Sequence, residues 1–437
     1  MTLRVLLIFA VMAGAYAAAK ARKASAEVSM FAAAVVGGLA AAFFRTPDLR
    51  ELPRHLVEGS FTYLDVILLF FTATFFMAIL NASGGVDFVV RSTLRRLARF
   101  RAAALMVLML ILLVPGALTG AGSVSLLVVG APVAAALGGL GIAPRRVAAI
   151  LFIVAGLSAA APPVNIWAMI LCAGTAIPYL GFELPLGLPV LFAGIFTMLV
   201  LGLKKEVPVD AGKALEALPP VPPRMRWWRV LLPFLGFFGL VTASRVWPFG
   251  TPVFGLALEF VAAGLIAVLV SPVKVDILGL ARTTAKRLLP LLATMVVVGM
   301  LQQVMTASGV KGLFSYAVLA MPPVLLFILL PVIIPVSEGV LTYGGAAVIG
   351  IPLIWYLDSI GYHATVVIAG LSLLWPLGDG LPPTALIGRL SIMVSGYQGS
   401  LGSVRRAAWL PWLVITAVGM LMVLFSARLA FLVRWSM

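Results

Sequence analysis

The chain has 437 residues, of which 62% are hydrophobic and only 11% are charged, and its mean hydropathy is +1.15. This composition excludes a soluble globular protein, because apolar runs of about 17–25 residues, long enough to cross a bilayer, recur from end to end. A transmembrane β-barrel is also excluded, since its strands would alternate polar and apolar residues. The net charge of +16 lies mostly in short loops on one predicted side, so it does not indicate nucleic acid.

The apolar runs predict an all-α polytopic membrane protein in two halves. The first run, 3–19, has most of its positive charge after it, which favours a retained helix over a signal peptide. The expected segments of the first half are 3–19, 29–44, 59–80, a re-entrant helical pair 102–139, a broken span 145–177, and 184–203. Those of the second half are 227–247, 252–272, 288–308, a re-entrant pair 318–357, a broken span 363–397, and 407–432.

Short segments recur in the same order in both halves, which predicts an internal duplication. The matched pairs are "NASGG" (81–85) with "TASGV" (306–310), "PGALTG" (115–120) with "EGVLTY" (338–343), "VVGAP" (128–132) with "VIGIP" (348–352), and "APPVN" (161–165) with "LPPTA" (381–385). We therefore expect a first inverted repeat over 1–203, a cytoplasmic Pro-rich linker over 204–226 and a second inverted repeat over 227–437.

The positive charges predict the orientation. If each re-entrant pair enters and leaves on one face, each half crosses the membrane five times, and the odd number inverts the second half. Of the Lys and Arg residues, 22 then fall on one face and eight on the other. The rich face is cytoplasmic by the positive-inside rule, so both termini are expected in the periplasm, with the chain in a bacterial inner membrane. Two basic stretches, 86–101 and 273–289, are expected at the cytoplasmic interface or as charged loops.

Four segments interrupt the apolar helices: 118–123, 159–165, 336–345 and 377–384. Non-helical backbone at membrane depth survives only where it lines a cavity or is packed inside protein. The inverted plan brings all four near the midplane. There, freed carbonyls suit a cation and half-helix N-termini suit a carboxylate substrate.

Three ionisable residues lie in these parts of the chain. Glu338 is costly at membrane depth and is read as a cation ligand, a proton carrier or a partner of Arg389. Asp379, between two glycines, is read as a cation site, a proton relay or a hydrated loop cap. Arg389 is expected either to bind a substrate carboxylate or to extend to the cytoplasmic interface.

Neutral polar residues complete the candidate site. Asn165, Thr384, Thr119, Ser123, Ser337 and Thr342 are expected to contact substrate or ion, although hydroxyl side chains also cap half-helices. Asp65 and Glu259 are expected to be structural or interfacial. The single cysteine, Cys172, can form no internal disulfide and is expected to pack in the core, and no Cys/His metal pattern is present. No catalytic residue, Walker A loop, HExxH or GxSxG is found, and no cofactor is expected beyond Na⁺ or H⁺ as the coupling ion.

The sequence resembles the ion transporter superfamily, and within it the large membrane subunit of tripartite ATP-independent periplasmic (TRAP) transporters. The resemblance rests on 55–90, on "PGALTGAGSVSLLVVGAPVAAALG" (115–138) and on the two Pro-Pro breaks. It implies an elevator mechanism and Na⁺-driven uptake of a small organic anion such as a C4-dicarboxylate. It also implies two partners, a small membrane subunit and a periplasmic binding protein, besides membrane lipid.

The resemblance assigns substrate-binding positions to the hairpin tips and to the breaks. Those positions are Thr119, Gly120, Gly122, Ser123, Thr342, Gly344, Gly345, Pro162, Pro163, Pro382 and Pro383. The second tip, with Glu338 and Tyr343, departs from the Gly/Thr-rich tip of the family. The alternative within the class is a stand-alone dicarboxylate or citrate carrier, H⁺-coupled through Glu338 and Asp379. A channel and a membrane enzyme are the remote alternatives.

Overall fold

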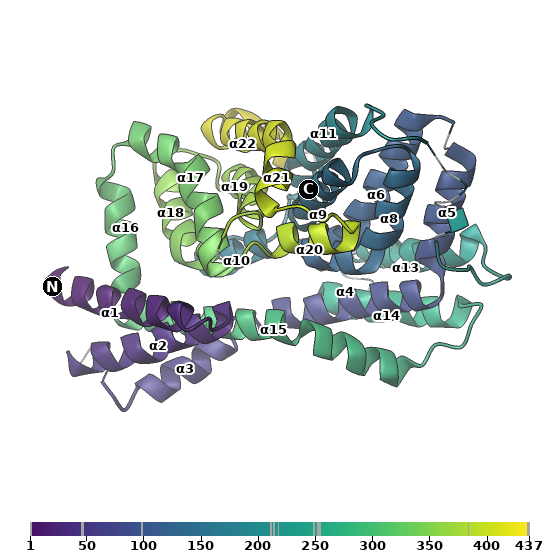
Figure 1. Ribbon diagram of the computed structural model, residues 1–437. Coiled ribbons are helices and arrows are strands. Elements are labelled where there is room, and N and C mark those ends of the chain that lie inside the picture. The colour runs from purple at the N-terminus through teal and green to yellow at the C-terminus, as the bar shows by residue number, and fades with distance from the viewer. Residues whose placement is uncertain are drawn as a thin grey trace.

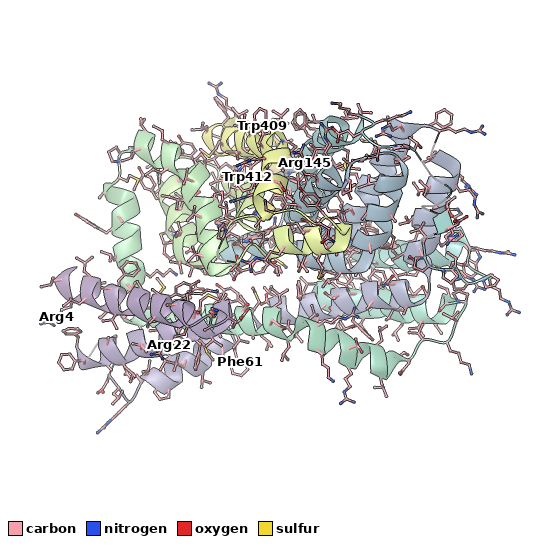
Figure 2. The ribbon with its side chains drawn as sticks, in the orientation of Figure 1. Arg4, Arg22, Phe61, Arg145, Trp409 and Trp412 are labelled. Atoms are coloured by element: carbon pink, nitrogen blue, oxygen red, sulfur yellow. The ribbon has the colours of Figure 1, made fainter. Side chains whose placement is uncertain are left out.

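The computed structural model describes residues 2–44, 48–97, 99–209, 212, 215–216, 218–247, 250, 255–382 and 384–434, which are helical throughout apart from short connections. Within these residues, nine helices are long and apolar enough to cross a membrane, or up to ten if one bent pair counts as a single span. Large apolar side chains are exposed on widely separated parts of the surface, such as Phe61 and Trp409 (Figure 2). The chain is a multi-pass α-helical membrane protein, as its composition predicts.

The helices form two layers (Figure 1). One layer, here called the slab, contains α1 (Thr2–Ala21), α2 (Ala26–Phe43), α3 (Leu52–Ser60), α4 (Leu64–Ala82), α13 (Trp227–Val246), α14 (Gly255–Val270) and α15 (Ile277–Ala307). Two helices run between the layers at opposite ends of the view, α5 (Gly85–Leu97) and α16 (Val310–Ala320).

The second layer, here called the bundle, holds the remaining helices and both helix-break regions. Its first-half members are α6 (Arg101–Thr119), α7 (Gly122–Ser125), the π-helix η1 (Leu126–Gly130), α8 (Ala131–Gly139), α9 (Pro144–Ala160), α10 (Ile166–Thr175) and α11 (Glu183–Gly202). Its second-half members are α17 (Pro323–Leu341), the π-helix η2 (Ala346–Gly350), α18 (Ile351–Ser359), α19 (Ala364–Gly378), α20 (Leu386–Ser395), α21 (Leu401–Ala407), α22 (Trp409–Leu424), the 3₁₀-helix η3 (Arg428–Ala430) and α23 (Phe431–Arg434).

Two helices form the centre of the bundle. Every residue of α9 from Val147 to Ala160 is buried, and so is every residue of α19 from Thr365 to Gly378. A helix that is apolar all round belongs inside a protein rather than at its surface. Both helices end at a Pro-containing or Gly-containing break, so each break follows directly on a fully buried helix.

Small residues allow the closest helix contacts. A Cβ atom added to Gly59 of α3 would lie 2.7 Å from the carbonyl oxygen of Gly299 on α15. The same holds between α19 and α22, where a Cβ on Gly370 would lie 2.7 Å from the carbonyl oxygen of Gly419. Helix association in membranes depends on such packing, because lipid offers no hydrophobic force between helices. Replacing any of these glycines would push two backbones apart.

Several backbone features recur at a fixed spacing in the two halves. The π-helices η1 and η2 begin 220 residues apart. Left-handed residues recur at the same spacing, as Gly141 with Gly361 and Ala176 with Gly396. Such conformations are costly for residues with a Cβ and do not recur without a structural cause. The two repeats and their boundaries remain a prediction, which these correspondences support.

Three predicted spans differ from the structure. The expected span 59–80 is part of a longer candidate span over Leu52–Ala82, within which tight turns at Phe61 and Thr62 separate α4 from the amphipathic α3. The expected span 288–308 begins at residue 277, because the Asp276 side chain accepts a hydrogen bond from the Gly279 N–H (3.0 Å) and caps α15 there. Most of the basic stretch 273–289 is therefore part of one 31-residue helix rather than a separate interfacial element.

The last expected span, 407–432, is also wrong in its bounds. Two helices replace it, α21 and α22, which meet at Ala408 with a bend of 64°. Pro411 lacks the N–H that would bond to the Ala407 carbonyl, so the helix cannot run through unbent. The apolar helix then ends at Leu424.

Candidate functional site

The tip of the first hairpin is a single left-handed turn. The helix α6 ends at Thr119, and Gly120 adopts φ 71°, donating its N–H to the Gly116 carbonyl (2.6 Å). A side chain at Gly120 would collide with Ile166, and one at Gly122 with Ile387 and the backbone of α9. Glycine is needed here because the broken helices α10 and α20 approach the tip closely.

The tip of the second hairpin has a more strained backbone. Thr342 has φ 53° and ψ −138°, and its N–H donates to the Glu338 carbonyl (2.7 Å). Gly344 and Gly345 follow, both buried. Tyr343, between Thr342 and this glycine pair, is also buried, and its hydroxyl donates to the Gly120 carbonyl across the two halves (3.5 Å). The two hairpin tips therefore meet inside the bundle.

The breaks of the two broken spans lie beside the hairpin tips. In the first half, the Val164 N–H donates to the Ala117 carbonyl of α6 (3.1 Å). In the second half, Thr384 donates both its N–H (3.2 Å) and its hydroxyl (2.9 Å) to the Gly339 carbonyl of α17. Each break is thus bonded to the hairpin of its own half, and the tip-to-tip contact joins the halves. The four interruptions expected from the sequence converge in the structure.

A carboxylate pair lies at this meeting point. Glu338 is 1% exposed and Asp379 is 6% exposed. The Trp167 indole Nε1–H of α10 donates to Glu338 Oε2 at 2.9 Å, and the same indole ring packs on Tyr343 with ring centroids 5.2 Å apart. The backbone at Gly378, next to Asp379, touches Glu338, since a Cβ there would lie 2.6 Å from the Glu338 Cβ.

The pair has few stabilising donors. Among the described residues, Trp167 is the only side chain that donates to Glu338, and the Asp379 carboxylate receives no hydrogen bond. Two carboxylates packed together in a low-dielectric interior cannot both remain charged unless a cation binds between them. Without a cation, one of the two must take up a proton. Across all the residues that the structure describes, no group of three His, Cys, Asp or Glu side chains is arranged to hold a metal ion.

Three of the expected hydroxyl ligands donate to nearby backbone carbonyls. Thr119 donates to Pro115 (2.7 Å), Ser337 to Ile334 (2.7 Å) and Thr342 to Leu341 (2.6 Å). Ser123 is half-buried at the start of α7 and forms no side-chain hydrogen bond within the described residues. The oxygen lone pairs of these hydroxyls can still accept from a ligand or face a cation.

Asn165 stabilises its own break. Its Oδ1 accepts from the Ala168 N–H (2.9 Å) as the N-cap of α10, and its Nδ2 donates to the Ala160 carbonyl at the end of α9 (3.0 Å). The amide therefore spans the gap between the two half-helices. The Tyr179 hydroxyl donates to the Pro163 carbonyl (3.0 Å) and accepts from the Asn165 N–H (3.2 Å). These bonds satisfy backbone groups that the break would otherwise leave unpaired.

The remaining predicted residues are more peripheral. Pro162 and Pro163 are half-buried, Pro382 is exposed, and Pro383 lies outside the described residues. Arg389 is an exposed residue of α20, one and a half turns past the break, and not a member of the buried cluster.

The sequence alone missed Trp167, Ser125 and Ser158. Ser125 accepts from the Gly116 N–H (2.8 Å) and contacts the Ser158 hydroxyl (3.0 Å), which ties α7 to α6 and α9. A polar aromatic two residues after Asn165 in an otherwise aliphatic half-helix was a signal for Trp167. Its partner lies 171 residues away, which no local pattern reveals.

These features define an all-α membrane protein whose interrupted helices meet around a buried carboxylate pair. Among solved structures, the chain is similar to that of the YdaH transporter of Alcanivorax borkumensis, with a TM-score of 0.59 and 14% sequence identity, over 89% of this chain and 90% of that chain. At this identity the similarity establishes a shared fold. No protein-family model matches the chain. No curated protein matches it by sequence.

Proposed function

We propose that the chain is a secondary active transporter that moves a small organic anion across the inner membrane. The observation that carries the proposal is the meeting of both hairpin tips and both helix breaks around Glu338 and Asp379. Discontinuous helices at one central place are the usual construction of ion-coupled transporters. The YdaH-like fold supports the same class.

The geometry favours an anionic substrate. Four helical segments begin at the convergence, at Gly122, Ile166, Ala346 and Leu386. A helix N-terminus carries unpaired N–H groups and a partial positive charge, which together stabilise a carboxylate. The exposed Arg389 lies on the segment that begins at Leu386, where its guanidinium supplies a further positive charge for an anion approaching the breaks.

The coupling ion in this proposal is a proton, in place of the Na⁺ that the family resemblance implies. A proton shared by Glu338 and Asp379 removes the repulsion of two adjacent buried charges and needs no further ligand. Dehydrated Na⁺ would need further oxygen ligands besides the two carboxylates. Protonation of the pair on one side of the membrane and release on the other would couple the gradient to substrate movement.

The two layers suggest how the site reaches each side. We propose that the bundle is the moving part and the slab the fixed scaffold of an elevator, with the two halves in inverted orientation (Figure 1). The recurrence of η1 as η2 at a spacing of 220 residues supports the duplication. A hydrogen bond from the Tyr16 hydroxyl of α1 to the Val340 carbonyl of α17 joins the layers beside the second tip.

The TRAP assignment adds a testable requirement. A TRAP large subunit works with a small membrane subunit and a periplasmic binding protein, whereas a stand-alone carrier transports by itself. We propose the stand-alone form, in which the chain transports without a binding protein. If the purified chain transports only when a binding protein is added, the TRAP form is correct instead.

The test is uptake of radiolabelled succinate and citrate into proteoliposomes that contain the purified chain alone, with pH and Na⁺ gradients imposed separately. We expect saturable uptake driven by the pH gradient and lost in Glu338→Gln and Asp379→Asn. The matched control is Glu259→Gln, since Glu259 is a buried carboxylate (3% exposed) on slab helix α14. Flux that does not saturate would indicate a channel, and equal coupling in Glu338→Gln and wild type would exclude the carboxylate pair as the coupling site.

A further inference from the structure

A groove of about 810 Å³ lies away from the carboxylate pair, between α5 and the segment that leads into α13. Four arginines line it, Arg91, Arg95, Arg96 and Arg226, against one acidic side chain, Glu216. Its volume is within the range of small-ligand sites. The charge balance favours an anion.

Arg91 is fixed in the wall of this groove. Its Nη2 donates to the carbonyls of Leu218 (2.7 Å) and Pro219 (3.0 Å), which ties α5 to the Pro-rich linker. Its Nε is buried and has no hydrogen-bond partner among the described residues. A buried guanidinium donor without an acceptor is unfavourable and points to a ligand that supplies one.

Asp87, an acidic neighbour of Arg91, lies one turn earlier on α5 and does not line the groove. Burial raises the pKa of the Asp87 carboxyl, and the neighbouring Arg91 offsets this only in part. Even with Glu216 and Asp87 both counted as charged, the four arginines leave the groove with an excess of positive charge.

An aromatic wall borders the arginines. Phe88 and Trp227 pack edge to face, with ring centroids 5.3 Å apart, and both line the groove. Trp227 begins the membrane span α13 and, with Trp228, remains partly exposed. Tryptophans at the end of a span lie at the level of lipid headgroups. The positive charges and the apolar wall thus meet where a phospholipid changes from headgroup to acyl chain.

We propose that this groove binds the phosphate headgroup of an anionic phospholipid, with the arginines on the phosphate and the Phe88–Trp227 pair beside the glycerol and the upper acyl chain. Basic pockets beside membrane spans hold such headgroups, and Arg recognises phosphate through paired N–H donors. A bound lipid would link α5, which leads from slab to bundle, to the linker between the two halves.

Native mass spectrometry of the full chain in detergent tests this, with phosphatidylglycerol and phosphatidylcholine as probes. Wild type should retain phosphatidylglycerol in preference to phosphatidylcholine. The double variant Arg95→Gln/Arg96→Gln should weaken retention by about five-fold per arginine, roughly 25-fold together. The matched control is Lys204→Gln/Lys205→Gln, which removes the same charge from an exposed pair outside the groove and should leave retention unchanged.

Three results would overturn the proposal. Equal loss of lipid in the groove variant and the lysine control would mean that total charge, and not the groove, holds it. Equal retention of the two lipids would exclude headgroup recognition. Displacement of phosphatidylglycerol by an equimolar amount of glycerol 3-phosphate would identify a soluble phosphate ester as the ligand instead of a lipid.

Discussion

Replacing Trp167 by phenylalanine separates the indole hydrogen bond from the packing of the ring. The phenyl ring can still pack on Tyr343, 5.2 Å away, but the donor to Glu338 Oε2 at 2.9 Å is lost. Glu338 is 1% exposed, so water cannot replace that donor. Loss of a hydrogen bond to a buried polar group costs about 1–3 kcal/mol, which corresponds to about a 5- to 150-fold change in an opening equilibrium.

The chain contains its own reporter for this opening. Cys172 is the only cysteine, is 4% exposed and lies on α10, the same half-helix as Trp167. A fluorogenic thiol reagent reacts with Cys172 only when α10 opens, so the labelling rate measures the opening equilibrium. We expect Trp167→Phe to accelerate labelling by the factor given above.

A matched control removes the effect of side-chain volume. Trp375 is equally buried, at 0% exposed, but its indole Nε1 has no hydrogen-bond partner within the described residues. Trp375→Phe therefore loses the same volume without breaking a hydrogen bond, and it removes an unsatisfied donor. If the two variants label at the same rate, the Trp167–Glu338 bond does not stabilise the site.

Three further predictions follow from close contacts and charge. Gly116→Ala should destabilise the protein by about 1–3 kcal/mol, because the new Cβ would overlap the Ser158 hydroxyl, and Ser158→Ala should restore part of the loss in a thermal unfolding assay. Gly299→Ala should destabilise the slab by a similar amount, because the Cβ would collide with the Gly59 carbonyl; an unchanged melting temperature would contradict this packing. Arg389→Ala and Arg389→Lys should both raise the KM of uptake if the guanidinium binds the anion through paired N–H groups, and an unchanged KM in both would exclude direct contact.

Much of the backbone plan could be predicted because prolines and glycines mark it. Gly120 ends α6 where the sequence suggests a hairpin tip, and the Pro162–Pro163 pair separates α9 from α10. These residues act locally, through a missing N–H or a left-handed conformation, so their effect is visible in the sequence. The start of α15 was missed because Asp276 reads as part of a basic loop until its role as an N-cap is known.

The composition of the site was harder to predict than its position. Asn165 was expected to face a substrate, yet both ends of its amide bond to backbone within the break. Trp167 was not expected at all, because a tryptophan in an apolar helix is typical of a lipid-facing or core residue. Which polar groups face each other depends on helix rotation and on contacts between segments far apart in sequence, and periodicity does not fix these.

The position of Glu338 accounts for why this chain breaks its helices where it does. An intact helix would leave the carboxylate among aliphatic side chains with no donor, at a cost of several kcal/mol. The breaks bring the Trp167 indole and the backbone next to Asp379 into contact with it, and four helical segments begin in the same region. The indole alone does not compensate two carboxylates, so the site is stable only with a proton or cation, or when the pair faces water. A site with this requirement is stable when a proton or cation is bound and unstable when empty in the membrane interior, so in the proposed transporter it would disfavour movement of the empty site.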